Sequence, residues 1–148
     1  MEAAALALEQ WDAVRALRSS FYAYPIVSAL HVLGIGLLLT GVLLMDLRLL
    51  GAFAALPAEP FVTLLRRLTL AGFAVAVLTG LTLFSVRAAD YVALPLFWVK
   101  MGLIVAAGLN LAALLWVGRA KRLFGALSLL LWLGVLFAGR FLGFVYAA

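Results

Sequence analysis

Four apolar stretches, each longer than 20 residues, alternate with short polar segments along this chain of 148 residues. A helix needs about 20 residues to cross the hydrocarbon core of a bilayer. Backbone polar groups within lipid must find partners inside their own segment, which favours helices. We expect spans at 22–48, 61–86, 95–117 and 123–144. The short connections make neighbouring spans antiparallel, which predicts an all-α integral membrane four-helix bundle, a single domain over 1–148.

The composition supports a membrane protein and excludes several other classes. Hydrophobic residues make up 68% of the chain and charged residues 11%, whereas soluble domains carry about 25% charged residues. The absence of cysteine rules out disulfides, thiolate metal sites and redox dithiols. We find no nucleophile–base pair, no paired interior carboxylates and no phosphate-binding loop. A hydrolytic or phosphoryl-transfer enzyme is therefore not expected.

The segment before the first span, residues 2–18, has its own pattern. The series Leu8, Trp11, Val14 (or Arg15) and Leu17 recurs at three-residue steps, with charged residues on the other side. This pattern predicts an amphipathic interfacial helix that places Trp11 at the level of the lipid headgroups. The alternative is a frayed, solvated terminus.

Basic residues are distributed unequally between the two expected faces of the membrane. The first and third connections with their flanks hold Arg48, Arg66, Arg67, Arg119, Lys121 and Arg122. The opposite face holds Arg15, Arg18, Arg87 and Lys100. The positive-inside rule places the first set in the cytoplasm. We therefore expect a multi-pass protein of the bacterial inner membrane with both termini in the periplasm. The net charge of +5 then requires no nucleic-acid partner.

The sole histidine of the chain, His31, lies in the first expected span on the same helical face as Gly34 and Gly41. Lys100 and Arg140 lie at a similar depth from the same side of the membrane. Because Arg or Lys at mid-membrane costs at least about 2.5–3.5 kcal/mol, such residues should face the interior, a cavity or a partner. A b-type haem could be bound here, with His31 as the metal ligand. Gly34 and Gly41 would leave room for the ring, and Lys100 and Arg140 would pair with its propionates.

Further residues complete this haem hypothesis. Trp98 and Trp132 would pack against the edge of the ring. Because the chain has one histidine, the haem would be five-coordinate, His/Met coordinated or shared across a dimer. Such a protein would carry electrons or form a small subunit of a redox complex, as a homo-oligomer or within a larger assembly.

Each of these polar residues also has a simpler interpretation. His31 can serve as an interhelical hydrogen-bonding residue, and Lys100 and Arg140 can extend to the membrane surface. Asn110 can make a packing hydrogen bond, and Asp46 can pair with nearby arginines.

Two other functions therefore stay open. The first is a cofactor-free accessory or scaffold subunit that docks through small residues at four-residue spacing, such as Gly72, Ala76 and Gly80. The second is an oligomeric transporter or channel for small solutes or metal ions.

Four segments carry a family resemblance: Tyr24–Gly51, Ala71–Lys100, the helix through Asn110, and Leu129–Phe141. They resemble an uncharacterised family of small bacterial four-span membrane proteins. More distantly, the histidine-bearing span and the Trp98-x-Lys100 motif are similar to copper-resistance protein D type domains and to haem-associated protoporphyrinogen oxidases. The distant resemblance implies a haem-associated membrane domain. Asn110 stands where those groups would carry a further histidine, and this difference argues against oxidase activity.

Overall fold

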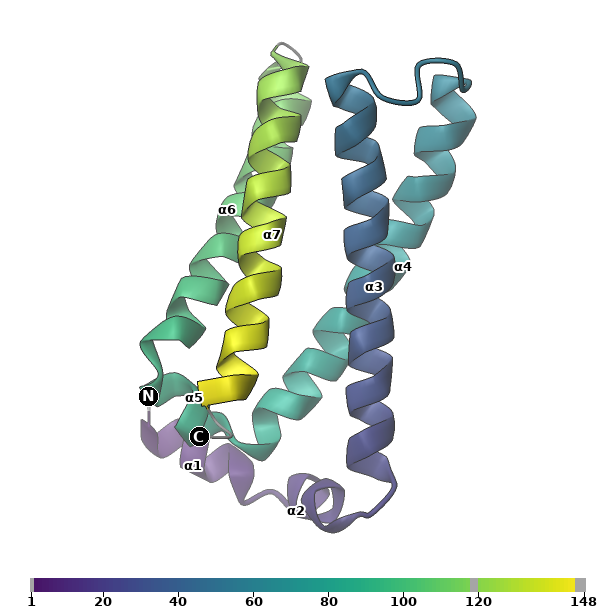
Figure 1. Ribbon diagram of the computed structural model, residues 1–148. Coiled ribbons are helices and arrows are strands. Elements are labelled where there is room, and N and C mark those ends of the chain that lie inside the picture. The colour runs from purple at the N-terminus through teal and green to yellow at the C-terminus, as the bar shows by residue number, and fades with distance from the viewer. Residues whose placement is uncertain (1, 118–119, 146–148) are drawn as a thin grey trace. The chain divides into compact units, whose positions relative to one another are not determined.

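The computed structural model describes residues 2–117 and 120–145, and within these ranges all regular structure is helical. The helices, shown in Figure 1, are α1 (Glu2–Glu9), α2 (Asp12–Ser19), α3 (Ala23–Leu50), α4 (Ala58–Val86), α5 (Ala88–Ala93), α6 (Pro95–Val117) and α7 (Lys121–Val145). The predicted all-α, four-helix membrane fold is confirmed.

Four helices in the described part of the chain are long and apolar enough to cross a membrane: α3, α4, α6 and α7. Within their most apolar windows only 11–22% of the residues are buried inside the chain. Apolar side chains therefore cover most of the outer surface of these helices, as lipid requires. The protein is a multi-pass membrane protein.

The chain divides into two compact units. The first unit comprises Met1–Leu38 and Leu68–Pro95, and the second comprises Leu39–Arg67 and Leu96–Ala148. Helices α3 and α4 each contribute one part to each unit.

In the first unit, α3 and α4 cross with their backbones in contact. A Cβ atom on Gly72 would lie 2.6 Å from the backbone nitrogen of Leu38, and one on Gly34 would lie 2.7 Å from the nitrogen of Ala76. Both glycines are buried. The missing side chains are what allow this close approach, as expected for small residues at a membrane helix interface.

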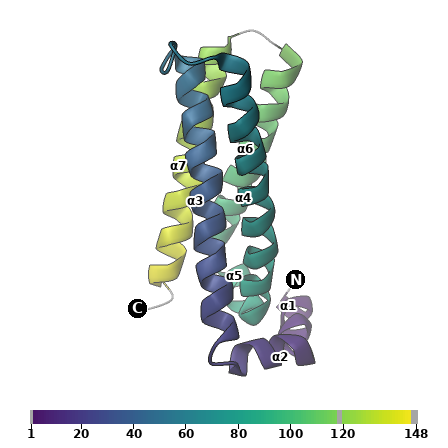
Figure 2. The ribbon, with the colours of Figure 1, turned by 90° about the vertical axis from the view of Figure 1, so that its right-hand side faces the viewer.

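The N-terminal segment forms two helices, so the prediction of one helix over 2–18 was wrong. Trp11 adopts an extended conformation (φ −62°, ψ 137°) and precedes α2, while Asp12 occupies the first turn, where a negative charge is favourable. Helix α1 lies against α5 (Figures 1 and 2), and Ala5 on α1 and Ala88 on α5 are both buried. The Glu9 carboxylate accepts the backbone N–H of Ala89 at 2.8 Å.

The connection at 87–94 also differs from the expected loop, because it contains α5. Glu9 binds an N–H group in the first turn of that helix, and such groups have no partner within their own helix. The two short helices therefore support one another, which local sequence does not reveal.

In the second unit, the end of α3 packs against α7. A Cβ on Gly125 would lie 3.2 Å from Leu49 Cβ and 3.3 Å from the Asp46 carbonyl oxygen. Helix α3 ends at Leu50, and Gly51 follows with a φ of +109° that suits glycine. The connection that follows is held by Arg48, which donates to the carbonyls of Phe53 and Leu56.

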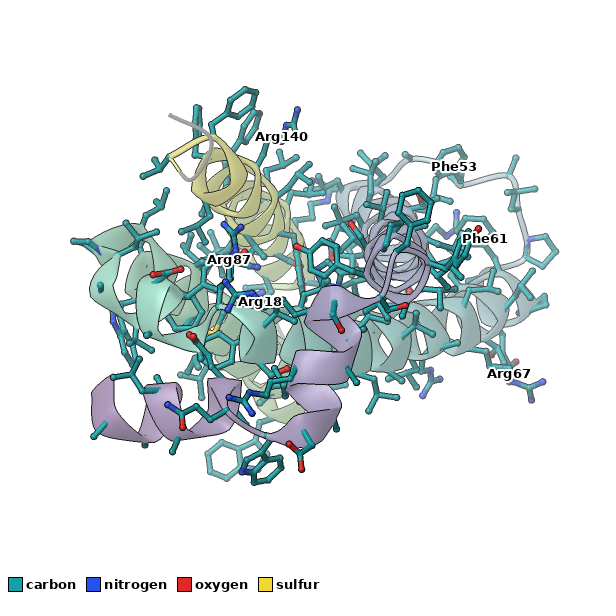
Figure 3. All side chains as sticks on the ribbon, turned by 90° about the horizontal axis from the view of Figure 1, so that it is seen from below. Arg18, Phe53, Phe61, Arg67, Arg87 and Arg140 are labelled. Atoms are coloured by element: carbon teal, nitrogen blue, oxygen red, sulfur yellow. The ribbon has the colours of Figure 1, made fainter. Side chains whose placement is uncertain are left out.

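The rings of Phe53 and Phe61 also pack together in this connection, tilted by 40° to one another. The ring centroids lie 5.8 Å apart, and Figure 3 shows the two rings side by side. The contact joins the loop after α3 to the first turn of α4.

Candidate functional site

His31 makes its defining contact with α4 inside the first unit. Its Nδ1 lies 2.9 Å from the Thr79 hydroxyl oxygen. That hydroxyl lies 2.5 Å from the carbonyl oxygen of Val75 and donates its single proton there. With its own proton on the Val75 carbonyl, the Thr79 hydroxyl accepts a hydrogen bond from Nδ1–H. In the neutral imidazole this tautomer carries its lone pair on Nε2.

Gly80 provides the space for the imidazole. A Cβ at this position would lie 2.9 Å from His31 Cε1, closer than real Cβ atoms approach another atom. The ring therefore lies over the bare backbone of Gly80 and is half-buried. Thr79 and Gly80 together determine the orientation of His31. Neither residue was among the predicted site residues, and Gly80 was predicted only as one of a series of small residues.

The two glycines predicted to accompany His31 have different surroundings. The space beside Gly34 is filled by the α4 backbone, with the Gly72 carbonyl oxygen 3.1 Å from a Cβ at that position. Gly34 therefore allows α3 and α4 to pack closely and leaves no open space beside it for a ring. Gly41 belongs to the second unit, where it is buried.

The remaining predicted residues lie on α6 and α7 in the second unit. Lys100 lies beside Gly139, whose Cβ position is 3.7 Å from Nζ. Arg140 is exposed, with its guanidinium carbon 4.6 Å from the centroid of the Phe144 ring. In Figure 3 its side chain extends away from the ribbon. Trp98 is 44% exposed and packs edge-on against Phe97, with 5.4 Å between the ring centroids.

The first unit has a cavity of about 210 Å³. Two arginine side chains that were not among the predicted site residues line it. It is lined by Arg18, Tyr24, Val86 and Arg87. Figure 3 shows Arg18 and Arg87 next to one another. In the sequence both arginines bear only on the orientation of the spans. Arg18 lies near the end of α2 and Arg87 directly after α4, so no sequence pattern joins them.

The cavity and the imidazole share the same pair of helices. Tyr24 lies seven residues before His31 on α3, and Val86 lies seven residues after Thr79 on α4. Seven residues return to the same helical face and advance about 10 Å along the axis. The cavity-lining residues Tyr24 and Val86 therefore lie on the same helical faces as His31 and Thr79, about two turns away.

Tyr91 on α5 borders this region. Burial raises the pKa of its hydroxyl, Tyr24 raises it further and Arg87 opposes the shift. The phenol is thus neutral at physiological pH and leaves the positive charge of the arginines in place.

The described residues contain no group of three or more His, Cys, Asp or Glu side chains that could hold a metal ion. A tetrapyrrole differs from such a site because the macrocycle itself provides most ligands and the protein provides one or two. Comparison with family models, curated proteins and solved structures gave no match.

The hydrogen bond to Thr79 can be tested because His31 is the sole histidine. We expect ¹⁵N NMR of histidine-labelled protein, purified without a histidine tag, to show the Nδ1–H tautomer. Thr79→Val removes the acceptor, and a lost hydrogen bond of about 1 kcal/mol shifts the tautomer ratio about fivefold towards Nε2–H.

Thr79→Ser keeps the hydroxyl and is the matched control for this experiment. It should retain the spectrum of the unmodified protein. A wild-type spectrum dominated by Nε2–H would contradict the assigned geometry.

Proposed function

We propose that this chain is a protein of the bacterial inner membrane that binds a b-type haem or related tetrapyrrole through Nε2 of His31. The observation that carries the proposal is the hydrogen bond from Nδ1 to Thr79. Metal-ligating histidines characteristically donate their second ring N–H in this way, which sets both the tautomer and the ring orientation. The bound haem would supply one-electron transfer.

The arginine-lined cavity supports the choice of an anionic cofactor. Haem propionates are carboxylates, and guanidinium groups bind carboxylates with paired hydrogen bonds. The cavity that Arg18 and Arg87 line lies about two turns from His31 along α3 and α4. We assign the propionates to these two residues. The roles first predicted for Lys100 and Arg140 stay predictions, since both belong to the other unit.

The surroundings of His31 also bear on how the iron would be coordinated. One histidine per chain provides one imidazole ligand. The haem is therefore five-coordinate, takes a methionine as second ligand, or is shared between two copies of the chain. We propose a homo-oligomer or a small subunit of a larger redox complex. With the termini in the periplasm, the site lies near the periplasmic face.

An absorption spectrum before and after reduction with dithionite tests this function. We expect a Soret band that shifts on reduction, in protein as purified or after addition of haemin. His31→Ala removes the ligand and should abolish the band. Thr79→Ser keeps the hydrogen bond and should preserve it. Wild-type protein without a Soret band after haemin addition would overturn the proposal.

The contact between His31 and Thr79 also favours a second candidate function. This hydrogen bond joins α3 to α4 directly, so a protein without cofactor could use it for packing alone. The chain would then be an accessory or scaffold subunit. In that case it should co-purify with a membrane complex, and His31→Ala should lower its stability without changing that association.

A further inference from the structure

Two polar side chains are deeply buried in the second unit. Asp46 on α3 and Asn110 on α6 are each only 6% exposed. Both lie in helices that are otherwise apolar enough to cross a membrane. Neither residue takes part in the site around His31.

Both side chains reach the same turn of α7. The Ser128 side chain is hydrogen-bonded to Asp46, and the Asn110 amide donates to the carbonyl of Phe124 at 3.0 Å. Between them Gly125 brings the α7 backbone against the Asp46 carbonyl. Helices α3, α6 and α7 therefore place three polar side chains around one turn of helix.

Each of the two buried side chains has an oxygen atom without a partner. Asp46 Oδ2 and Asn110 Oδ1 are fully buried and accept no hydrogen bond from the described residues. A buried acceptor without a partner is unfavourable, and a buried carboxylate without a counter-charge is more so. Both oxygen atoms lie beside one turn of α7, and a small cation bound there would interact favourably with them.

Basic side chains of the surrounding helices do not supply the counter-charge. Arg48 donates to the loop carbonyls of Phe53 and Leu56, and Lys100 lies ten residues before Asn110 on α6. Other charged side chains at the ends of α4 and α7 are exposed to solvent: Glu59, Arg66, Arg67, Lys121 and Arg122. Within residues 2–117 and 120–145, these basic side chains therefore leave the Asp46 carboxyl without a counter-charge.

We propose that Asp46, Asn110 and Ser128 form a binding site for one small cation, a proton or Na⁺. All three offer oxygen atoms, which suit a proton and the hard alkali cations. A proton bound to Asp46 Oδ2 removes the negative charge and makes this unpartnered oxygen a hydrogen-bond donor. The site lies four residues before the end of α3, about 6 Å from the connection that follows. The cation enters from that end of the unit.

Infrared spectroscopy of the protein in nanodiscs tests this site. Protonated carboxyl groups have a C=O stretch distinct from the carboxylate bands. If the ligand is a proton, we expect this band at neutral pH in both sodium-containing and sodium-free buffer, and its loss in Asp46→Asn. If the ligand is Na⁺, the band appears when N-methylglucamine replaces sodium and disappears when sodium is restored.

Two further variants keep the test decisive if Asp46→Asn does not fold. Ser128→Ala removes a hydrogen bond to Asp46 and should shift the frequency of the band without abolishing it. Glu59→Gln removes an exposed carboxyl and should leave the band unchanged. A spectrum with only carboxylate bands at neutral pH both with and without sodium, or a band unaffected by Ser128→Ala, would overturn the proposal.

Discussion

Gly72→Ala should lower the free energy of unfolding by about 3 kcal/mol, near the upper end of the range for overpacked interiors. The new Cβ would lie 2.6 Å from the backbone nitrogen of Leu38 and 2.9 Å from the carbonyl oxygen of Gly34. Both are backbone atoms of α3, so no side-chain rotation relieves the clash. The two helices must move apart, and the contacts along their crossing are lost.

Gly36→Ala is the matched control for this experiment. It lies on the same pair of helices, but a Cβ at Gly36 meets no atom within 4 Å. We expect almost no change in its stability. Unfolding in mixed micelles with increasing SDS, followed by tryptophan fluorescence and circular dichroism, gives both values. Equal stability of the two variants would contradict the close crossing of α3 and α4 at Gly72.

Gly80→Val should displace the imidazole of His31 without altering the histidine itself. A Cβ at Gly80 would lie 2.9 Å from His31 Cε1, and valine adds two methyl groups with a restricted χ1. The planar ring must turn away and lose its hydrogen bond to Thr79. We expect the Nδ1–H tautomer to be lost and, if haem binds at His31, the Soret band to fall as far as in His31→Ala.

Gly108→Val provides the control for adding a β-branched side chain to a membrane helix. Its Cβ position on α6 meets no atom within 4 Å. Histidine-labelled NMR and haem titration should therefore give wild-type results. A Gly80→Val protein that keeps both the wild-type tautomer and its haem would contradict the position of His31 over Gly80. Loss of the tautomer in a protein that never bound haem would support the geometry and count against the cofactor.

The sequence predicted the spans well because hydrophobic length is a local property. The expected span 95–117 coincides with α6 (Pro95–Val117), and the other three differ from the observed helices by at most three residues at either end. The prediction failed at the N-terminal segment. Its composition favours one continuous helix, whereas contacts with α5, 80 residues away, hold two.

The candidate site was only partly accessible to sequence reasoning. His31 stood out because a lone histidine in an apolar helix is conspicuous. Its partners Thr79 and Gly80, and the arginine pair at 18 and 87, became visible only in three dimensions. Asp46 was expected among arginines, yet its side chain is hydrogen-bonded to Ser128 on α7.

The sequence by itself determined the helical class, the number of spans and their limits, because these depend on runs of apolar residues and on the helix ends beside them. Only the tertiary structure decided which side chains meet. Helix α3 is apolar on nearly every side, since lipid and protein neighbours both accept apolar groups. Its hydrophobic pattern therefore carries no information about which face turns inward. Close packing at Gly34 and Gly72 sets that rotation, and with it the contact of His31 with Thr79.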